Sequence, residues 1–200
     1  MAGLKRKNLV ELIFATQNQN KVNEINQIVP EGIKVVSLLE LGYKEDLAED
    51  FETLEENSMQ KAKFVFDFFK KNCFAEDTGL EIDALNGAPG VYSARFAGEE
   101  KDMQKNMDKV LALLGDVNNR AARFKTVITY CMPNECVQFV GVLEGSIGFE
   151  RRGENGFGYD PIFYLPDGRA LAELSKMDKG EISHRGKAFQ KLILHLKKCL

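Results

Sequence analysis

A strand–helix–strand pattern opens the sequence, and it restricts the fold more than any other feature. Residues 9–15 form an apolar run with the length of a buried strand. Apolar residues then recur at helical spacing over 22–29, and the segment 30–32 (Pro-Glu-Gly) ends that helix. Residues 33–38 are again apolar and strand-like. A chain that begins this way has to bury a sheet beneath helices.

The remaining patterns extend this arrangement along the chain. Thr53 and Glu56 form a capping box, which predicts a helix to about residue 72. The other predicted elements are a short strand over 73–75, a helix over 102–114, strands over 121–150 with a hairpin turn at 133–134, and a helix over 183–198. Strands and helices that alternate at both ends, around a β-rich centre, predict a mixed α/β fold.

Length and charge narrow the class of protein. The chain has 200 residues and a formal net charge of −3, which predicts one domain and disfavours a broad basic face for nucleic acid. No apolar run approaches the roughly 18 residues that span a bilayer. Residues 1–8 are basic, but the apolar stretch after them is short and contains Glu11, so it is a poor signal peptide. We therefore expect a soluble cytoplasmic protein with no membrane and no nucleic acid as partners.

The cysteines indicate the same compartment. The four cysteines show no CxxC spacing, and only two histidines are present, too few for a zinc site. Reduced and mostly buried thiols are the prediction.

Two segments place cations where a predicted helix begins. Residues 16–21 (Thr-Gln-Asn-Gln-Asn-Lys) join the first strand to its helix, and Lys21 is electrostatically unfavourable there unless an anion binds. Residues 183–187 (Ser-His-Arg-Gly-Lys) repeat the arrangement, with Arg185 able to clamp a phosphate or a base edge and His184 able to donate. Anion binding is the functional interpretation of both segments. A solvated loop and a basic surface turn are the alternatives.

Acidic residues supply the complementary chemistry. Glu76 and Asp77 follow the predicted short strand, and neighbours on an extended chain point to opposite sides, so their roles can differ. Together with an acid from the stretch 45–56 they are able to hold Mg²⁺. The alternatives are an Asx turn at Asp77 and a solvated acidic face.

Two further segments carry candidate ligand-binding residues. Lys61 lies four residues after Asn57 and shares its helix face; the alternative is a lysine that only snorkels beside an apolar stripe. Residues 153–161 pack three glycines around Phe157 and Tyr159, which suits close approach to a ligand and stacking on it. A β-bulge or a plain loop is the alternative here.

Taken in order, these segments resemble the inosine/xanthosine triphosphate pyrophosphatase family. The matching segments are 15–21, 56–62, 76–80, 87–95, 157–163 and 183–186, and the resemblance runs from about residue 9 to about residue 198. One departure is Gln17, where the family usually has glycine.

The resemblance implies a fold, an activity and an assembly. The implied fold is an elongated mixed sheet with flanking helices, in two lobes around a central substrate cleft, as a single domain over 1–200. The implied reaction is the Mg²⁺-dependent hydrolysis of aberrant purine nucleoside triphosphates (ITP, dITP, XTP) to the monophosphate and pyrophosphate. The implied assembly is a homodimer. A pyrophosphatase for modified pyrimidine nucleotides and a non-hydrolysing nucleotide-binding regulator are the alternatives.

Site residues follow from the same resemblance, position by position. It implies that Asp77 is the base for water and, with Glu49, a metal ligand; Asp50 and Glu52 are the alternatives to Glu49. It implies that the loop 16–21 and Lys61 hold the phosphates and that Thr78 touches the substrate. Residues 157–160, Lys179, His184 and Arg185 would frame the nucleotide, chiefly its base. The implied substrate-binding residues are Thr16, Gln17, Asn18, Gln19, Asn20, Lys21, Lys61, Thr78, Phe157, Gly158, Tyr159, Asp160, Lys179, His184 and Arg185.

Overall fold

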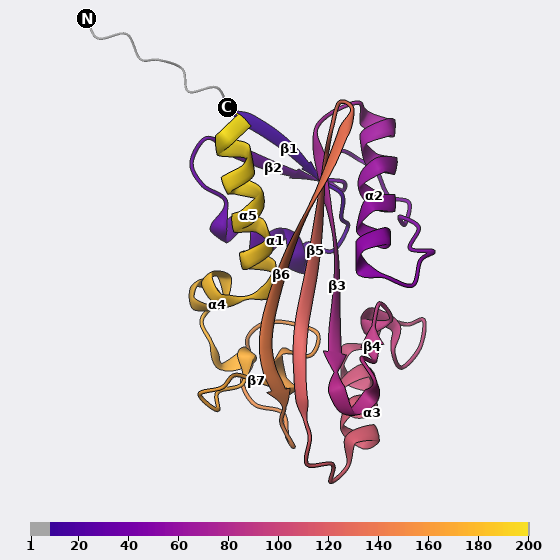
Figure 1. Ribbon diagram of the computed structural model, residues 1–200, viewed down its shortest axis with the longest axis vertical. Helices are drawn as coiled ribbons and strands as arrows, with labels where there is room; N and C mark the ends of the chain where they lie inside the picture. The colour runs from indigo at the N-terminus through magenta and orange to yellow at the C-terminus, as the bar shows by residue number, and fades with distance from the viewer. Residues whose placement is uncertain (1–8, 200) are drawn as a thin grey trace, which may run out of the picture.

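Helices cover both faces of a seven-stranded mixed sheet in the computed structural model, which describes residues 9–199 (Figure 1). The strand order is β2-β1-β3-β5-β6-β7, with β4 beside β3. The strands are β1 (Val10–Phe14), β2 (Ile33–Ser37), β3 (Cys73–Ile82), β4 (Pro89–Gly90), β5 (Ala121–Met132), β6 (Glu135–Ile147) and β7 (Phe163–Tyr164). The helices are α1 (Gln19–Ile28), α2 (Leu54–Phe69), α3 (Met103–Leu114), α4 (Lys176–Ile182) and α5 (His184–Cys199).

The predicted fold class is confirmed. The long β5–β6 hairpin runs the length of an elongated molecule, with α5 on one side of the sheet and α2 on the other (Figure 1). No helix among the described residues is both long and apolar enough to cross a bilayer. The prediction of a single domain stays a prediction, and the predicted absence of a signal peptide concerns residues 1–8, outside the described part.

Alternation along the strands separates the cores on the two faces. Leu12 and Phe14 of β1 pack in one apolar cluster with Phe189 of α5, whereas Ile13 between them packs in another with Val65 of α2. Successive side chains of a strand point to opposite faces, so a fully apolar strand serves both helices. A third cluster joins α3 to the far end of the sheet.

The connections put a crevice at the carboxyl end of β1. Strands β1, β2 and β3 are parallel, and β1 lies between the other two. The chain leaves β1 through α1 and reaches β3 through α2, and these helices lie on opposite faces of the sheet. Such a switch point is where open α/β sheets bind ligands.

The prediction that Glu76 and Asp77 lie at a strand end is wrong, because β3 continues to Ile82. Pairing with β5 over all ten residues of β3 keeps these polar residues in the strand. Their other edge is different: β1 ends opposite Phe74, and β4 begins only opposite Leu80. The segment 75–79 therefore has an open edge, which takes the place of the predicted strand end.

Other predictions are confirmed with small changes. The Thr53 hydroxyl accepts a hydrogen bond from the Glu56 amide and caps α2. The hairpin turn falls at Pro133–Asn134 as expected. Helix α4 was not predicted; it has seven residues, contains Gly180 and is joined to α5 through Ser183.

The prediction of reduced cysteines is wrong for one pair. Cys131 and Cys136 form a disulfide, because the hairpin places them directly opposite each other with their Cα atoms 4.2 Å apart. Cys73 is free and buried. The side chain of Cys199 lies outside the described part of the chain.

A close approach of β6 to the start of α5 yields a test of this packing. A Cβ atom at Gly141 would lie 2.0 Å from the His184 carbonyl oxygen and 2.6 Å from the Ala188 nitrogen. Both are backbone atoms that cannot rotate away, so Gly141→Ala should cost about 3 kcal/mol in the free energy of unfolding by urea. Gly42→Ala is the control: it meets open space and should cost only about 1 kcal/mol for its left-handed φ of +77°. Equal costs would refute the close contact.

Candidate active site

A cavity of about 760 Å³ opens at the unpaired edge of β3. This volume suits a small-molecule ligand. Every predicted site residue except Gln19 lines it; the side chain of Gln19 is exposed and donates to Asn23. A smaller cavity of about 480 Å³, at the far ends of β5 and β6, is lined by none of the predicted residues.

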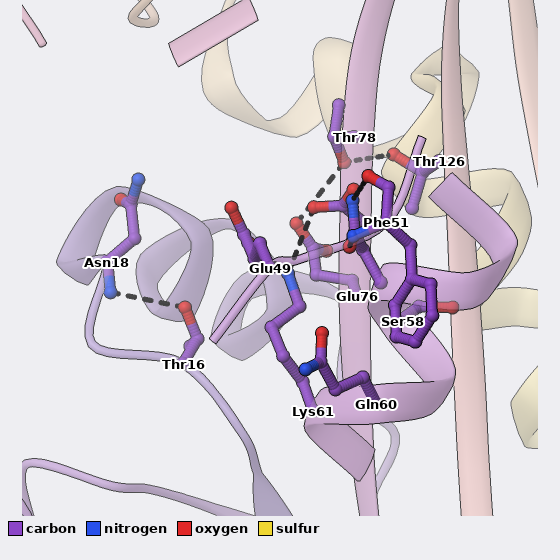
Figure 2. A network of polar contacts seen from close by, with 12 residues as sticks. Thr16, Asn18, Glu49, Phe51, Ser58, Gln60, Lys61, Glu76, Thr78 and Thr126 are labelled. Carbon is purple, nitrogen blue, oxygen red and sulfur yellow. Dashed lines mark hydrogen bonds and ion pairs between the residues drawn. The ribbon is translucent and has the colours of Figure 1, made fainter. Parts of the chain in front are cut away.

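The loop 16–21 is pinned by its own side chains. The Asn18 side chain caps α1 by accepting from the Asn20 and Lys21 amides at 3.0 and 3.3 Å. Thr16 Oγ1 accepts from the Asn18 amide at 3.1 Å (Figure 2). Three amides of the loop therefore already have hydrogen-bond partners within it, and the charge of Lys21 is compensated by Glu76, 3.0 Å away.

Lys61 of α2 lines the cavity and lies between two carboxylates. It is only 5% exposed, so the snorkelling alternative is wrong. Its Nζ lies 2.5 Å from Glu49 Oε1 and 2.9 Å from Asp77 Oδ1, and Figure 2 shows Glu49 beside it. The two carboxylates therefore lie close together, because both contact the same nitrogen.

Charge is unevenly compensated in this cluster. Burial would lower the pKa of Lys61, but Asp77 and Glu49 outweigh it and raise that pKa. Burial raises the pKa of Asp77, and the nearby Glu49 raises it further against the pull of Lys61. Burial also opposes ionisation of Glu49, yet Lys61, Lys21 and Arg95 together lower its pKa. One ammonium shared by two carboxylates leaves Asp77 the less stabilised anion.

The acidic stretch reaches the cavity through a clamp on α2. Asn57 is buried, accepts from the Phe51 amide at 2.9 Å and donates to the Phe51 carbonyl at 3.0 Å. The Asp50 amide donates to Gln60, also on α2. The neighbouring Glu49 is thereby turned into the cavity, whereas Asp50 and Glu52 do not line it.

Glu76 serves the opposite face of the sheet from Asp77, as strand alternation predicts. It is 2% exposed and accepts from Arg185 Nε and Nη2, both at 2.8 Å. Burial would raise its pKa, but Arg185 and Lys21 hold that pKa well below the usual range. The side chain of Glu76 therefore stays ionised and ties α1 and α5 to β3.

Glu24 is a residue of this network that the sequence did not identify. Its carboxylate accepts from Arg185 and, at 2.6 Å, from Lys179. The signal was its position three residues after Lys21, which puts the two on one face of α1. Its partners lie more than 150 residues away in the chain, so the spacing alone could not identify them.

The far end of the cavity combines aromatic rings with buried polar groups. His184 stacks on Phe124 with ring centroids 4.6 Å apart. Burial, with Arg185 and Lys179 adding to it, lowers the pKa of His184 far below its usual value, so the ring is neutral. Its Nδ1 is buried and has no hydrogen-bond partner among the described residues.

Phe157 is held over the same region. Asp160 accepts from the Phe157 amide at 2.7 Å and from Lys179 Nζ at 2.6 Å. The Lys179 ammonium lies 5.1 Å from the centre of the Phe157 ring. A flat ring is thus fixed in the same cavity as the buried His184 Nδ1, an arrangement that suits a heterocyclic base.

Comparison with known proteins identifies the family. The model of the Ham1 family matches residues 12–195. The chain belongs to the Ham1 family. The Staphylococcus aureus Ham1 structure superimposes with a TM-score of 0.86 at 42% identity, covering 95% of this chain and 100% of that one. The Coxiella burnetii HAM1 structure gives 0.85 at 37% identity, covering 94% and 99%.

Curated relatives of this Ham1-family protein carry a functional name. One from Christiangramia forsetii, named dITP/XTP pyrophosphatase, is 47% identical over 191 residues, which are 94% of this chain and 100% of the relative. Another from Bacillus subtilis has the same name and is 46% identical, over 91% of this chain and 94% of the relative.

The buried pair of Glu76 and Arg185 gives this Ham1-family protein a testable pH dependence. A carboxyl whose folded pKa is depressed contributes stability above its ordinary value of 4.5, and this contribution is lost as the pH falls toward the folded pKa. Glu76→Gln should cost about 3–5 kcal/mol at pH 7. The cost should shrink below pH 4.5, measured by urea unfolding at several pH values.

Glu55→Gln is the matched control for that measurement. Glu55 pairs with Lys125 at 2.7 Å on the surface of the protein, so its loss should cost at most about 1 kcal/mol. A cost for Glu76→Gln that stays constant from pH 7 to pH 3 would contradict an ionised Glu76.

Proposed function

We propose that this protein hydrolyses aberrant purine nucleoside triphosphates (ITP, dITP and XTP) to the nucleoside monophosphate and pyrophosphate. The observation that carries the proposal is Lys61, buried between Glu49 and Asp77 at the open edge of β3. A displacement at phosphorus needs cations, a metal and an oriented water more than it needs a covalent nucleophile. The family and the names of the relatives support the same reaction.

Mg²⁺ is the cofactor that the donor set fits. Glu49 and Asp77 offer oxygen ligands that converge on one nitrogen. Among residues 9–199 no cluster of three or more acidic, His or Cys side chains is arranged to hold a metal alone. Mg²⁺ suits such a site, because it is usually held by one or two carboxylates together with water and substrate phosphates. Bound there, it would neutralise charge on the phosphates.

The side chains at the two ends of the cavity take separate roles in this proposal. Asp77 accepts the proton of the attacking water, and its raised pKa suits a general base. Lys61 and Lys21 hold phosphates on either face of β3. Thr78, bonded to Thr126 at 2.6 Å, lines the cavity on the Glu76 face and contacts the substrate. Phe157 stacks on the base.

The neutral His184 suits recognition of a 6-oxo purine. With the proton on Nδ1, it donates to the 6-oxo oxygen of hypoxanthine or xanthine, where adenine presents an amino group instead. Arg185 assists from beside it, although Glu76 and Glu24 already accept most of its donors. A pocket for modified pyrimidines and a non-hydrolysing regulator are less favoured, because the named relatives are purine pyrophosphatases.

The remaining assignments are also proposals. We propose that the protein acts in the cytoplasm, because its substrates belong to the nucleotide pool. A homodimer follows from the resemblance described above. A nucleic-acid partner is not expected, given the net charge of −3.

Asp77→Asn tests the reaction. The amide keeps the shape of the side chain but cannot take a proton from water, so kcat with ITP and Mg²⁺ should fall by at least ~10²–10⁴-fold. Chromatography of the wild-type reaction should give IMP and pyrophosphate. Asp83→Asn, just beyond β3, is the control and should retain activity. IDP as the main product, or full activity in Asp77→Asn with unchanged circular dichroism, would contradict the proposal.

His184→Phe tests recognition of the base. A phenyl ring keeps the stack on Phe124 and removes Nδ1. The kcat/KM for ITP should fall roughly tenfold or more, while that for ATP changes much less, because only the 6-oxo base loses a hydrogen bond. His195→Phe, on the same helix but outside the cavity, is the matched control.

Equal losses for ITP and ATP in His184→Phe would assign base selection to other residues. Arg185→Ala is a less clean test, because it would leave Glu76 and Glu24 without their buried partner.

A further inference from the structure

Arg95 differs from the other arginines in the described part of the chain. The others each donate at least one guanidinium hydrogen bond: Arg120, Arg123, Arg151, Arg152, Arg169 and Arg185. Among the described residues, the Arg95 guanidinium has no such bond. It makes one ion pair, with Glu49 at 3.7 Å, and lies 5.5 Å from the centre of the Tyr92 ring. Its donors are therefore available.

The backbone that carries Arg95 is firmly held. Ser93 Oγ donates to the Gly90 carbonyl at 2.6 Å and accepts from the Leu80 amide of β3 at 2.8 Å. The Ser93 carbonyl also accepts from the buried Tyr159 hydroxyl at 2.8 Å. Arg95 lines the cavity and is about one-quarter exposed. Because the backbone at Arg95 is already ordered, little backbone entropy is lost when its side chain binds a ligand.

Glu49 shows which end of the cavity Arg95 reaches. One carboxylate oxygen of Glu49 binds Lys61, and the other faces Arg95. Arg95 and Lys61 therefore contact the same carboxylate through different oxygens. The rings of Phe157 and His184, by contrast, lie with Lys179 and Arg185. Arg95 belongs to the end that we assign to the phosphates.

The other cations of that end are already engaged. Lys21 pairs with Glu76, and Lys61 pairs with both Glu49 and Asp77. A triphosphate brings several negative charges that these pairs only partly meet. A guanidinium binds two phosphate oxygens at once, whereas an ammonium acts as a point charge. The ion pair between Arg95 and Glu49 is long, at 3.7 Å, so breaking it to bind a phosphate costs little free energy.

We propose that Arg95 binds the two terminal phosphates of the substrate and holds the pyrophosphate group as it leaves. This inference rests on the proposed function, and none of the resemblances above assigns the residue a role. It divides the cavity into a nucleoside monophosphate part and a pyrophosphate part, with Arg95 serving only the second.

Titration calorimetry with two probes tests this division. Inorganic pyrophosphate with Mg²⁺ and, separately, IMP are titrated into the wild type, Arg95→Ala and Arg95→Lys. Arg95→Ala should raise the Kd for pyrophosphate roughly ten- to a hundredfold, the usual effect of losing charge-assisted hydrogen bonds. The Kd for IMP should stay within about twofold. The Kd of Arg95→Lys for pyrophosphate should lie between those of the wild type and Arg95→Ala, because lysine keeps the charge but cannot bind two phosphate oxygens at once.

Two controls separate direct binding from indirect effects. Arg151→Ala removes an arginine paired with Asp108 outside the cavity and should leave both Kd values unchanged. In a Glu49→Gln background, Arg95→Ala should still weaken pyrophosphate by the same factor. If that factor disappears, Arg95 acts only by positioning Glu49, and the proposal is overturned.

The outcomes also distinguish this proposal from the proposed function. Unchanged pyrophosphate binding in Arg95→Ala, or an equal loss for pyrophosphate and IMP, would overturn the role of Arg95 while the wild type still hydrolyses ITP. A wild type that does not hydrolyse ITP would instead overturn the proposed function, whatever the calorimetry gives.

Discussion

One buried carboxylate, Glu76, holds together the parts that make the cavity. It receives two hydrogen bonds from Arg185 of α5 and an ion pair from Lys21 of α1. Glu24 extends this network from Arg185 to Lys179 of α4. Burying such charges is costly, and it is tolerated because each has several partners of opposite sign. What the network provides is geometry: the loop after β1 and the helices at the far end are fixed relative to each other.

The opposite face of β3 carries a cluster in which carboxylates outnumber cations. Asp77 and Glu49 share the single ammonium of Lys61, and burial raises the pKa of Asp77. The carboxylate of Asp77 is therefore stabilised when another cation binds beside it or when it accepts a proton. Glu76 has an excess of cationic partners and holds the structure together, which leaves its neighbour Asp77 for the role of general base that we propose. Strand alternation alone allows two adjacent acids to be divided in this way.

Much of this could be predicted from the sequence, wherever the cause was local. Apolar spacing located β1, α1 and β2, and the Thr53 cap located the start of α2. Nearly all the site residues that the order of the motifs identified line the cavity, although the cavity has other lining residues as well. The misses have non-local causes. The length of β3 depends on pairing with β5, some fifty residues away. The disulfide of Cys131 and Cys136 depends on the register of one hairpin.

The open edge of β3 explains why these residues form a cavity at all. The Phe74 carbonyl accepts from the Ala15 amide, and the Leu80 amide donates to Ser93, so both peptide groups face this edge. By alternation the backbone of Glu76 and Thr78 faces the same way, while side chains leave to both faces of the sheet. An unpaired edge is normally a liability that a protein covers. Here the loops of Thr16 and Arg95 border it instead, and side chains from both faces of the sheet meet around a strand that, within the described part of the chain, has no neighbouring strand at this point of its edge.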